Sequence, residues 1–142
     1  MIQEAIQKAS QQLHQAELTK KTCSPVREII GSEDIDSAYE IQSHNIQQKI
    51  ANGATVKGYK IGLTSEAVQK QLGVDQPDFG VLLNTMEITT KEFSFSALMQ
   101  PKAEAEIAFF LKEDIIDPTL DLNKLKAAID YAVASVEIVG SR

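Results

Sequence analysis

Three glutamates fall within two segments that otherwise are typical of apolar strands. Glu104 and Glu106 lie in residues 101–111, PKAEAEIAFFL, and Glu137 interrupts residues 134–139, ASVEIV. Alternation along a strand places Glu104 and Glu106 on one face, about 6–7 Å apart at the backbone. Burying an ionised carboxylate without a partner is costly, so these acids indicate a metal ion, a basic partner or a strand face in contact with water.

A metal ion held by these residues would be a hard cation. Carboxylates without a nearby His or Cys favour Mg²⁺ or Mn²⁺, which complete their shells with water and substrate oxygens. Calcium fits less well, because the sequence lacks a calcium loop of Asp, Asn and Gly. The alternative is that Glu104 and Glu106 form a solvent-facing stripe. Glu137 contributes most to the metal hypothesis, because it stands alone in its apolar segment.

Lys60 is a second candidate for chemistry. It lies between Gly58 and Gly62 in residues 55–63, TVKGYKIGL, where glycines let the backbone approach a ligand closely. A lysine near a cation site can hold a substrate carboxylate or polarise an oxygen. The alternative is a lysine that protects a strand edge from pairing.

Asp78 is a third candidate, because it follows Pro77 and directly precedes Phe79. It is either a proton carrier held on a turn or an ordinary turn residue that bonds its own backbone. Two histidines, His14 and His44, lie among Gln and Asn on expected helices, so we expect them to be solvated.

Helices are expected first along the chain, before the segments that carry these residues. Residues 2–18 repeat apolar side chains at helical spacing, and residues 24–31 form a short turn or helical piece. Asp34 or Asp36 begins another helix, which Asn52-Gly53 ends. The apolar side of that helix is expected to consist of Ile35, Tyr39, Ile46 and Ile50.

Strands with interspersed helices follow, which makes α+β the expected fold class. A strand with bends is expected over residues 55–63, a short helix from Thr64 or Ser65 to Leu72, and an apolar segment over residues 79–83. Asp121 begins a helix with Leu122, Leu125 and Ile129 inward. That helix has a suitable length for a crossover, which makes the strand of Glu137 a plausible neighbour of the strand of Glu104.

Composition indicates one ordinary globular unit. The 142 residues are 43% apolar and 24% charged, with a single cysteine that excludes an internal disulfide. The net charge of −6 argues against nucleic acid and anionic lipid as partners. No apolar run is long enough for a membrane span or a signal peptide, so a cytoplasmic location is expected.

Four ordered blocks of sequence resemble the 2-keto-4-pentenoate hydratases of the fumarylacetoacetate hydrolase superfamily. The blocks are GYKIGLTS (58–65), QLGVDQPDFG (71–80), QPKAEAEIA (100–108) and VEIVGSR (136–142). The resemblance extends from about Val26 to Arg142 and covers roughly the first half of the family's chain. It implies an N-terminal helical region over residues 1–53 and, over residues 54–142, the first part of a mixed, strongly bent β-roll.

The resemblance also implies site residues and an activity. Glu104, Glu106 and Glu137 would bind Mg²⁺ or Mn²⁺, Lys60 would lie near substrate and metal, and Asp78 would transfer a proton or orient a water. The implied reaction adds water to 2-hydroxypenta-2,4-dienoate, a small 2-hydroxy dienoate, giving 4-hydroxy-2-oxopentanoate in meta-cleavage aromatic catabolism. A homo-oligomer is implied as well.

Three alternatives to this reaction stay open. A related decarboxylase acts on 2-oxo-hexenedioates with a similar metal site, although the block QPDFG (76–80) looks more like the hydratases. A longer dicarboxylate could be the hydratase substrate. A truncated, non-catalytic remnant of the family is the third alternative.

Overall fold

The computed structural model describes residues 2–141, which divide into two compact units. The first unit extends to Phe93 and the second covers Ser94–Ser141. In the first unit the elements are α1 (Ile2–Thr19), α2 (Arg27–Ile30), α3 (Ile35–Ala51), β1 (Val56–Gly62), α4 (Glu66–Leu72), β2 (Asp78–Leu83) and the 3-10 helix η1 (Asn84–Met86). In the second they are the 3-10 helix η2 (Phe95–Ala97), β3 (Lys102–Leu111), α5 (Leu122–Ala128) and β4 (Ile129–Val139).

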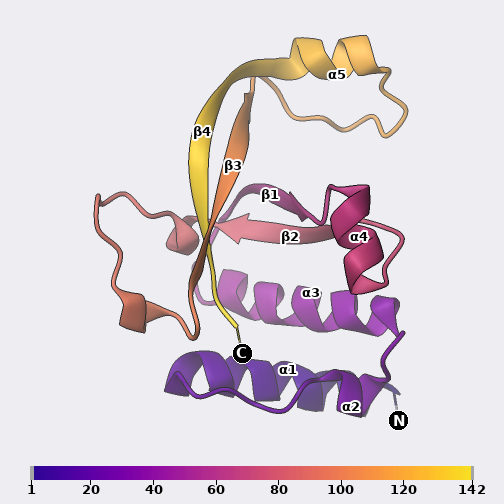
Figure 1. The fold of residues 1–142 in the computed structure, drawn as a ribbon, viewed down its shortest axis with the longest axis vertical. Coiled ribbons are helices and arrows are strands. Elements are labelled where there is room, and N and C mark those ends of the chain that lie inside the picture. The colour runs from indigo at the N-terminus through magenta and orange to yellow at the C-terminus, as the bar shows by residue number, and fades with distance from the viewer. Residues whose placement is uncertain (1, 142) are drawn as a thin grey trace. The chain divides into compact units, whose positions relative to one another are not determined.

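The core of the first unit lies between α1 and α3, which run side by side (Figure 1). Ile6 and Ala9 of α1 pack against Ile41 of α3, and each of the three is at most 2% exposed. Partly buried side chains surround this cluster, namely Leu13, Val26, Ile29 and Ile30. The helical periodicity expected over residues 2–18 is therefore confirmed.

The buried side of α3 differs from the expected one. Asp34 does cap the helix, because its carboxylate accepts from the backbone N–H of Ser37 at 2.9 Å. However, Ile41 is the buried apolar residue. On the expected side Ile35 is 47% exposed, and Tyr39, Ile46 and Ile50 are half-buried. Periodicity of apolar residues missed this face because polar side chains of α3 also contact α1.

Polar contacts complete the packing of α3 against α1. The buried Ser10 hydroxyl donates to Asn45 Oδ1 at 2.6 Å and lies 3.0 Å from His44 Nδ1. Lys49 donates to Glu17 at 2.6 Å. His44 is exposed, as expected, and it also takes part in this interhelical contact.

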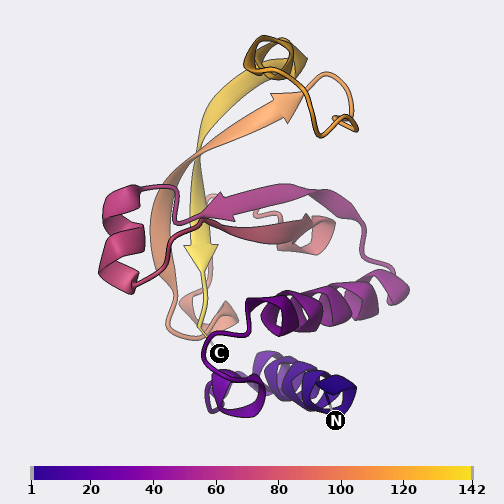
Figure 2. The ribbon, with the colours of Figure 1, turned by 90° about the vertical axis from the view of Figure 1, so that its right-hand side faces the viewer.

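A two-stranded antiparallel sheet follows the helices, and α4 connects its strands. The sheet lies beside α3, which separates it from α1 in both views (Figure 1, Figure 2). The N–H of Phe79 donates to Tyr39 Oη at 3.0 Å, and Gln42 Nε2 donates to the carbonyl of Phe79 at 3.1 Å. These bonds join the sheet to the helices within the first unit.

The second unit is built on the antiparallel pair of β3 and β4. Its strands are neighbours, as expected, but the expected crossover is wrong, because α5 runs directly into β4 at Ile129 and returns the chain antiparallel. Leu122 is 62% exposed and Leu125 is 39% exposed, so the expected inward face of this helix is also wrong. None of the helices within residues 2–141 combines the length and the apolar character needed to cross a bilayer.

Candidate metal centre and active-site residues

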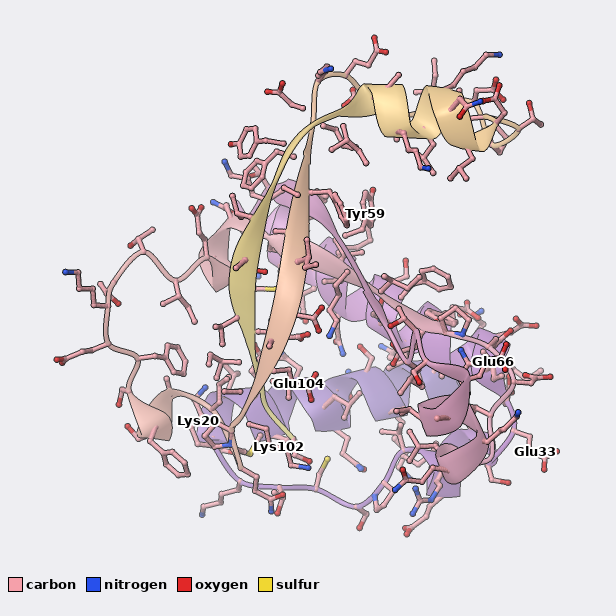
Figure 3. The ribbon with its side chains drawn as sticks, turned by 45° about the horizontal axis from the view of Figure 1, so that its top comes forward. Lys20, Glu33, Tyr59, Glu66, Lys102 and Glu104 are labelled. Carbon is pink, nitrogen blue, oxygen red and sulfur yellow. The ribbon has the colours of Figure 1, made fainter. Side chains whose placement is uncertain are left out.

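The three glutamates converge at one end of the β3–β4 pair. Glu104 and Glu137 are direct partners across the two strands, and Glu106 follows two residues later on β3, opposite Ser135. Partners across a ladder and residues two apart on a strand share one face, so all three carboxylates are on the same face. One carboxylate oxygen from each residue lies within 4.8 Å of the other two. Figure 3 labels Glu104 beside β3.

Three negative charges at this separation repel one another. Glu104 and Glu106 are exposed and Glu137 is half-buried, so water screens part of that repulsion. A divalent cation between the oxygens would replace the repulsion with attraction, and an all-carboxylate donor set suits a hard ion. A solvent-facing stripe along one strand would contain Glu104 and Glu106 but not Glu137. The position of Glu137 beside them therefore favours the metal hypothesis over the stripe.

The same face of β3 and β4 becomes aromatic toward the other end. Phe110 and Tyr131 are partners across the strands, and their rings stack with centroids 4.5 Å apart. Sequence reasoning missed Tyr131, although it stands an even number of residues from Glu137 on one strand. The face thus offers carboxylate oxygens at one end and an aromatic surface at the other, about 13 Å along the strand from Glu106 and about 20 Å from Glu104 and Glu137.

Lys60 and Asp78 occupy one face of the β1–β2 pair in the first unit. Lys60 is opposite Gly80, and Asp78 is opposite Gly62. Lys60 and Asp78 are therefore diagonal neighbours, with backbones on the order of 7–8 Å apart. Lys60 is half-buried and Asp78 is exposed at the first position of β2, directly after the turn that the sequence indicated.

Two shifted carboxyl groups lie away from these candidates and have local causes. Hydrogen bonds from the backbone and then the hydroxyl of Ser37 lower the pKa of Asp34. Bonds from the hydroxyl and then the backbone of Thr119 lower the pKa of Asp117. Both aspartates are capping or turn residues, so these shifts report local structure.

Curated relatives match almost the whole chain. "TodF product hydratase" of Pseudomonas putida is 45% identical over 139 residues, which are 97% of this chain and 52% of that protein. A "2-keto-4-pentenoate hydratase" of Paraburkholderia xenovorans is 45% identical over 137 residues, covering 96% of this chain and 51% of the relative. The chain spans about half the length of these relatives. No protein-family model matches the chain.

Solved structures match the same length of chain. The 4-oxalocrotonate decarboxylase of Pseudomonas putida, complexed with magnesium and adipate, is 29% identical with a TM-score of 0.84, over 97% of this chain and 53% of that one. The same enzyme with calcium and acetate is 30% identical with a TM-score of 0.88, over 97% and 54%.

The solved structures support the expected class of fold. The expected α+β fold, with N-terminal helices followed by strands of the fumarylacetoacetate hydrolase type, is confirmed by its structural neighbours. Within that class, the resemblance to the first half of the 2-keto-4-pentenoate hydratases is confirmed by relatives of that name at 45% identity.

Proposed function

We propose that this chain contributes to a hydratase that adds water to 2-hydroxypenta-2,4-dienoate, giving 4-hydroxy-2-oxopentanoate in aromatic catabolism. The observation that carries the proposal is the convergence of Glu104, Glu106 and Glu137 on one strand face. It occurs in a chain that is 45% identical to proteins named 2-keto-4-pentenoate hydratase. A relative at 37% identity is named 2-hydroxypent-2,4-dienoate hydratase, which supports the same substrate.

The three glutamates are the proposed ligands of Mg²⁺ or Mn²⁺. Their oxygens are close enough to share one ion, and the structural neighbours complexed with magnesium or calcium support a divalent metal. The bound ion would supply positive charge that offsets the negative charge of the substrate's carboxylate and 2-oxygen. Three carboxylates keep the net charge of such a site close to neutral.

Lys60 and Asp78 are the proposed residues that handle substrate and protons. The reaction moves the 2-hydroxyl proton away and adds a proton at C5, which gives a 2-oxo-3-enoate with an electrophilic C4. Water then adds its oxygen at C4, and C3 gains a proton. The Lys60 ammonium would hold the substrate carboxylate or polarise an oxygen, while the Asp78 carboxylate would orient the water or carry its proton.

A decarboxylase is the second candidate, because the solved neighbours are 4-oxalocrotonate decarboxylases. The names of the relatives with similar sequences favour the hydratase, and so does the presence of an acidic residue, Asp78, in the block QPDFG. A non-catalytic remnant is the third, because the chain spans about half the length of its relatives.

The deciding experiment follows the absorbance of 2-hydroxypenta-2,4-dienoate with the purified chain, with and without Mg²⁺ or Mn²⁺, and identifies the product by mass. Metal-dependent formation of 4-hydroxy-2-oxopentanoate supports the hydratase. Carbon dioxide release from a 2-oxo-hexenedioate, without hydration of the dienoate, supports the decarboxylase instead. A folded chain that turns over neither substrate points to an activity that needs residues outside this chain or to the non-catalytic remnant, and a metal titration then separates these two outcomes from a different substrate.

Three further features are part of the proposal. Residues 54–142 would form the first part of a β-roll that follows the helical region 1–53, and the protein would act as a homo-oligomer in the cytoplasm. Some apolar side chains of β3 and β4 stay exposed, such as Ile107 at 65% and Val136 at 63%. Their exposure supports burial of this surface against further protein. Sedimentation of the purified chain would test the oligomer.

A further inference from the structure

Two glycines lie under the side chains of Lys60 and Asp78. A methyl group built on Gly80 would stand 2.9 Å from Lys60 Cγ and 3.2 Å from Lys60 Cδ. A methyl group on Gly62 would collide with the Asp78 carboxylate. At Gly58, on the same strand, a methyl group would meet nothing within 4 Å.

These contacts show how the two side chains lie. Lys60 crosses from β1 over the backbone of β2 at Gly80, and Asp78 crosses from β2 over the backbone of β1 at Gly62. Each charged side chain thus occupies the space that a side chain on its cross-strand partner would fill. The arrangement is reciprocal, with a glycine opposite each of the two groups.

Space, and not backbone conformation, explains these glycines. The left-handed glycines are Gly31, Gly53 and Gly73, whereas Gly62 and Gly80 have no positive φ. Alanine at either position would cost no backbone strain, but it would collide with its neighbour. The sequence suggested that glycines around Lys60 admit a ligand, and the structure shows that the space over Gly62 holds the Asp78 carboxylate.

We propose that Gly80 and Gly62 are positioning residues that set the direction of the Lys60 ammonium and the Asp78 carboxylate. The proposal rests on the proposed function for its catalytic consequence. The contact at Gly80 involves stem carbons of the lysine, so an alanine there cannot be accommodated by moving the terminal ammonium alone. A lysine already held against the sheet loses less side-chain freedom when it binds a carboxylate, which strengthens binding.

The geometric part is tested by NMR on the full chain without substrate. Wild-type protein should show nuclear Overhauser contacts between the Hα protons of Gly80 and the Hγ protons of Lys60. The Gly80→Ala variant should lose the wild-type shifts of Lys60 Cγ and Cδ, and Gly58→Ala, the matched control, should keep them. Absence of the wild-type contact, or an unchanged Lys60 in Gly80→Ala, overturns the proposal.

The catalytic part is tested by kinetics of dienoate hydration. Gly80→Ala should raise KM and Gly62→Ala should lower kcat, each by about 10–100-fold, because a shift near 1 Å in a reacting group has effects of that size. Gly58→Ala should stay within about twofold of wild type. In a Lys60→Ala background, Gly80→Ala should have no further effect, because the two substitutions act through one side chain.

Additive effects in that double variant overturn the proposal. If Gly80→Ala alone fails to fold, the double variant should fold, since it lacks the colliding stem; failure of both also overturns it. The NMR contacts without any turnover remove the catalytic consequence for this chain but leave Gly62 and Gly80 as the residues that fix these two side chains.

Discussion

Glu104 and Glu137 face each other across a strand pair, with Glu106 beside them, so the loss of any one acid would leave the proposed ligand set incomplete. We expect Glu106→Gln and Glu137→Gln each to lower the affinity for Mg²⁺ or Mn²⁺ by more than about 10-fold, the lower end of what even indirect ligand contacts cost. Metal-dependent turnover should disappear. Titration calorimetry measures the affinity.

Glu113→Gln is the matched control for these variants, because Glu113 is an exposed acid of the same unit outside the cluster. It should bind metal as the wild type does. Full activity in either Glu106→Gln or Glu137→Gln would remove the ligand assignment.

Lys60 and Asp78 are expected to fail in different ways when substituted. Asp78→Asn should lower kcat by about 10²–10⁴-fold, the usual contribution of a proton-transferring group, with little change in metal affinity. Lys60→Ala should mainly raise KM, since it removes the ammonium group proposed to hold the substrate. Steady-state kinetics with Lys57→Ala, an exposed lysine of the same strand, provides the control. Wild-type kinetics in Lys60→Ala would make Lys60 an ordinary strand lysine.

The residue types of the site could be predicted from the sequence, but their pairing could not. Isolated acids in apolar strands are visible as a pattern, which is why Glu104, Glu106 and Glu137 stood out. The pairing of Glu104 with Glu137 depends on the direction and register of the two strands. Residues 112–128, which connect the strands, determine both. The role of Gly80 also depends on register, because nothing in sequence places it opposite Lys60.

At the scale of elements, the cap of α3 gives a pH prediction. The pKa of Asp34 is lowered in the folded chain, so its contribution to stability is present above the ordinary carboxyl pKa and is lost as pH falls through the lowered value. Asp34→Ala should therefore lower Tm at pH 7 and match wild type in strong acid. Asp36→Ala, a first-turn acid that does not cap the helix, should change Tm less. A difference that persists undiminished in acid would contradict the cap.

The packing of α3 against α1 gives a second element-scale prediction. Ile41 is 2% exposed in the core with Ile6, whereas Ile35 is 47% exposed. Ile41→Ala should lower the free energy of unfolding by about 2–5 kcal/mol, measured by urea denaturation. Ile35→Ala should cost much less. Equal losses in the two variants would favour the face that apolar periodicity alone suggested.

Elements with strong local signals were predictable, and their faces were less so. The helix expected over residues 2–18 and the end of α4 at Gly73 follow from periodicity and a left-handed glycine. The buried face of α3 was not predicted, because part of its packing is polar. Ser10 of α1 contacts His44 and Asn45 of α3. Hydrophobic periodicity cannot distinguish a polar contact between helices from a solvated face.

At the scale of the molecule, metal binding should raise the thermal stability of the folded chain. An ion that binds only the folded chain raises the free energy of unfolding by about 2.7 kcal/mol at 100 times its Kd. Thermal unfolding with and without excess Mg²⁺ measures this, and a chelator control fixes the metal-free value. In the chelator, Glu106→Gln should be at least as stable as wild type, because it removes one of three repelling charges. Metal without any effect on Tm would count against a site in this chain.

The hydrogen bonds at Phe79 make the helices part of the support for the active-site candidates. The amide of Phe79 bonds to the Tyr39 hydroxyl on α3, and Phe79 directly follows Asp78. Opening of α3 from the edge of β2 would therefore release that amide to exchange with solvent deuterium while the ladder between β1 and β2 remains paired. The exchange rate of this one amide therefore reports how often α3 opens away from the backbone beside Asp78.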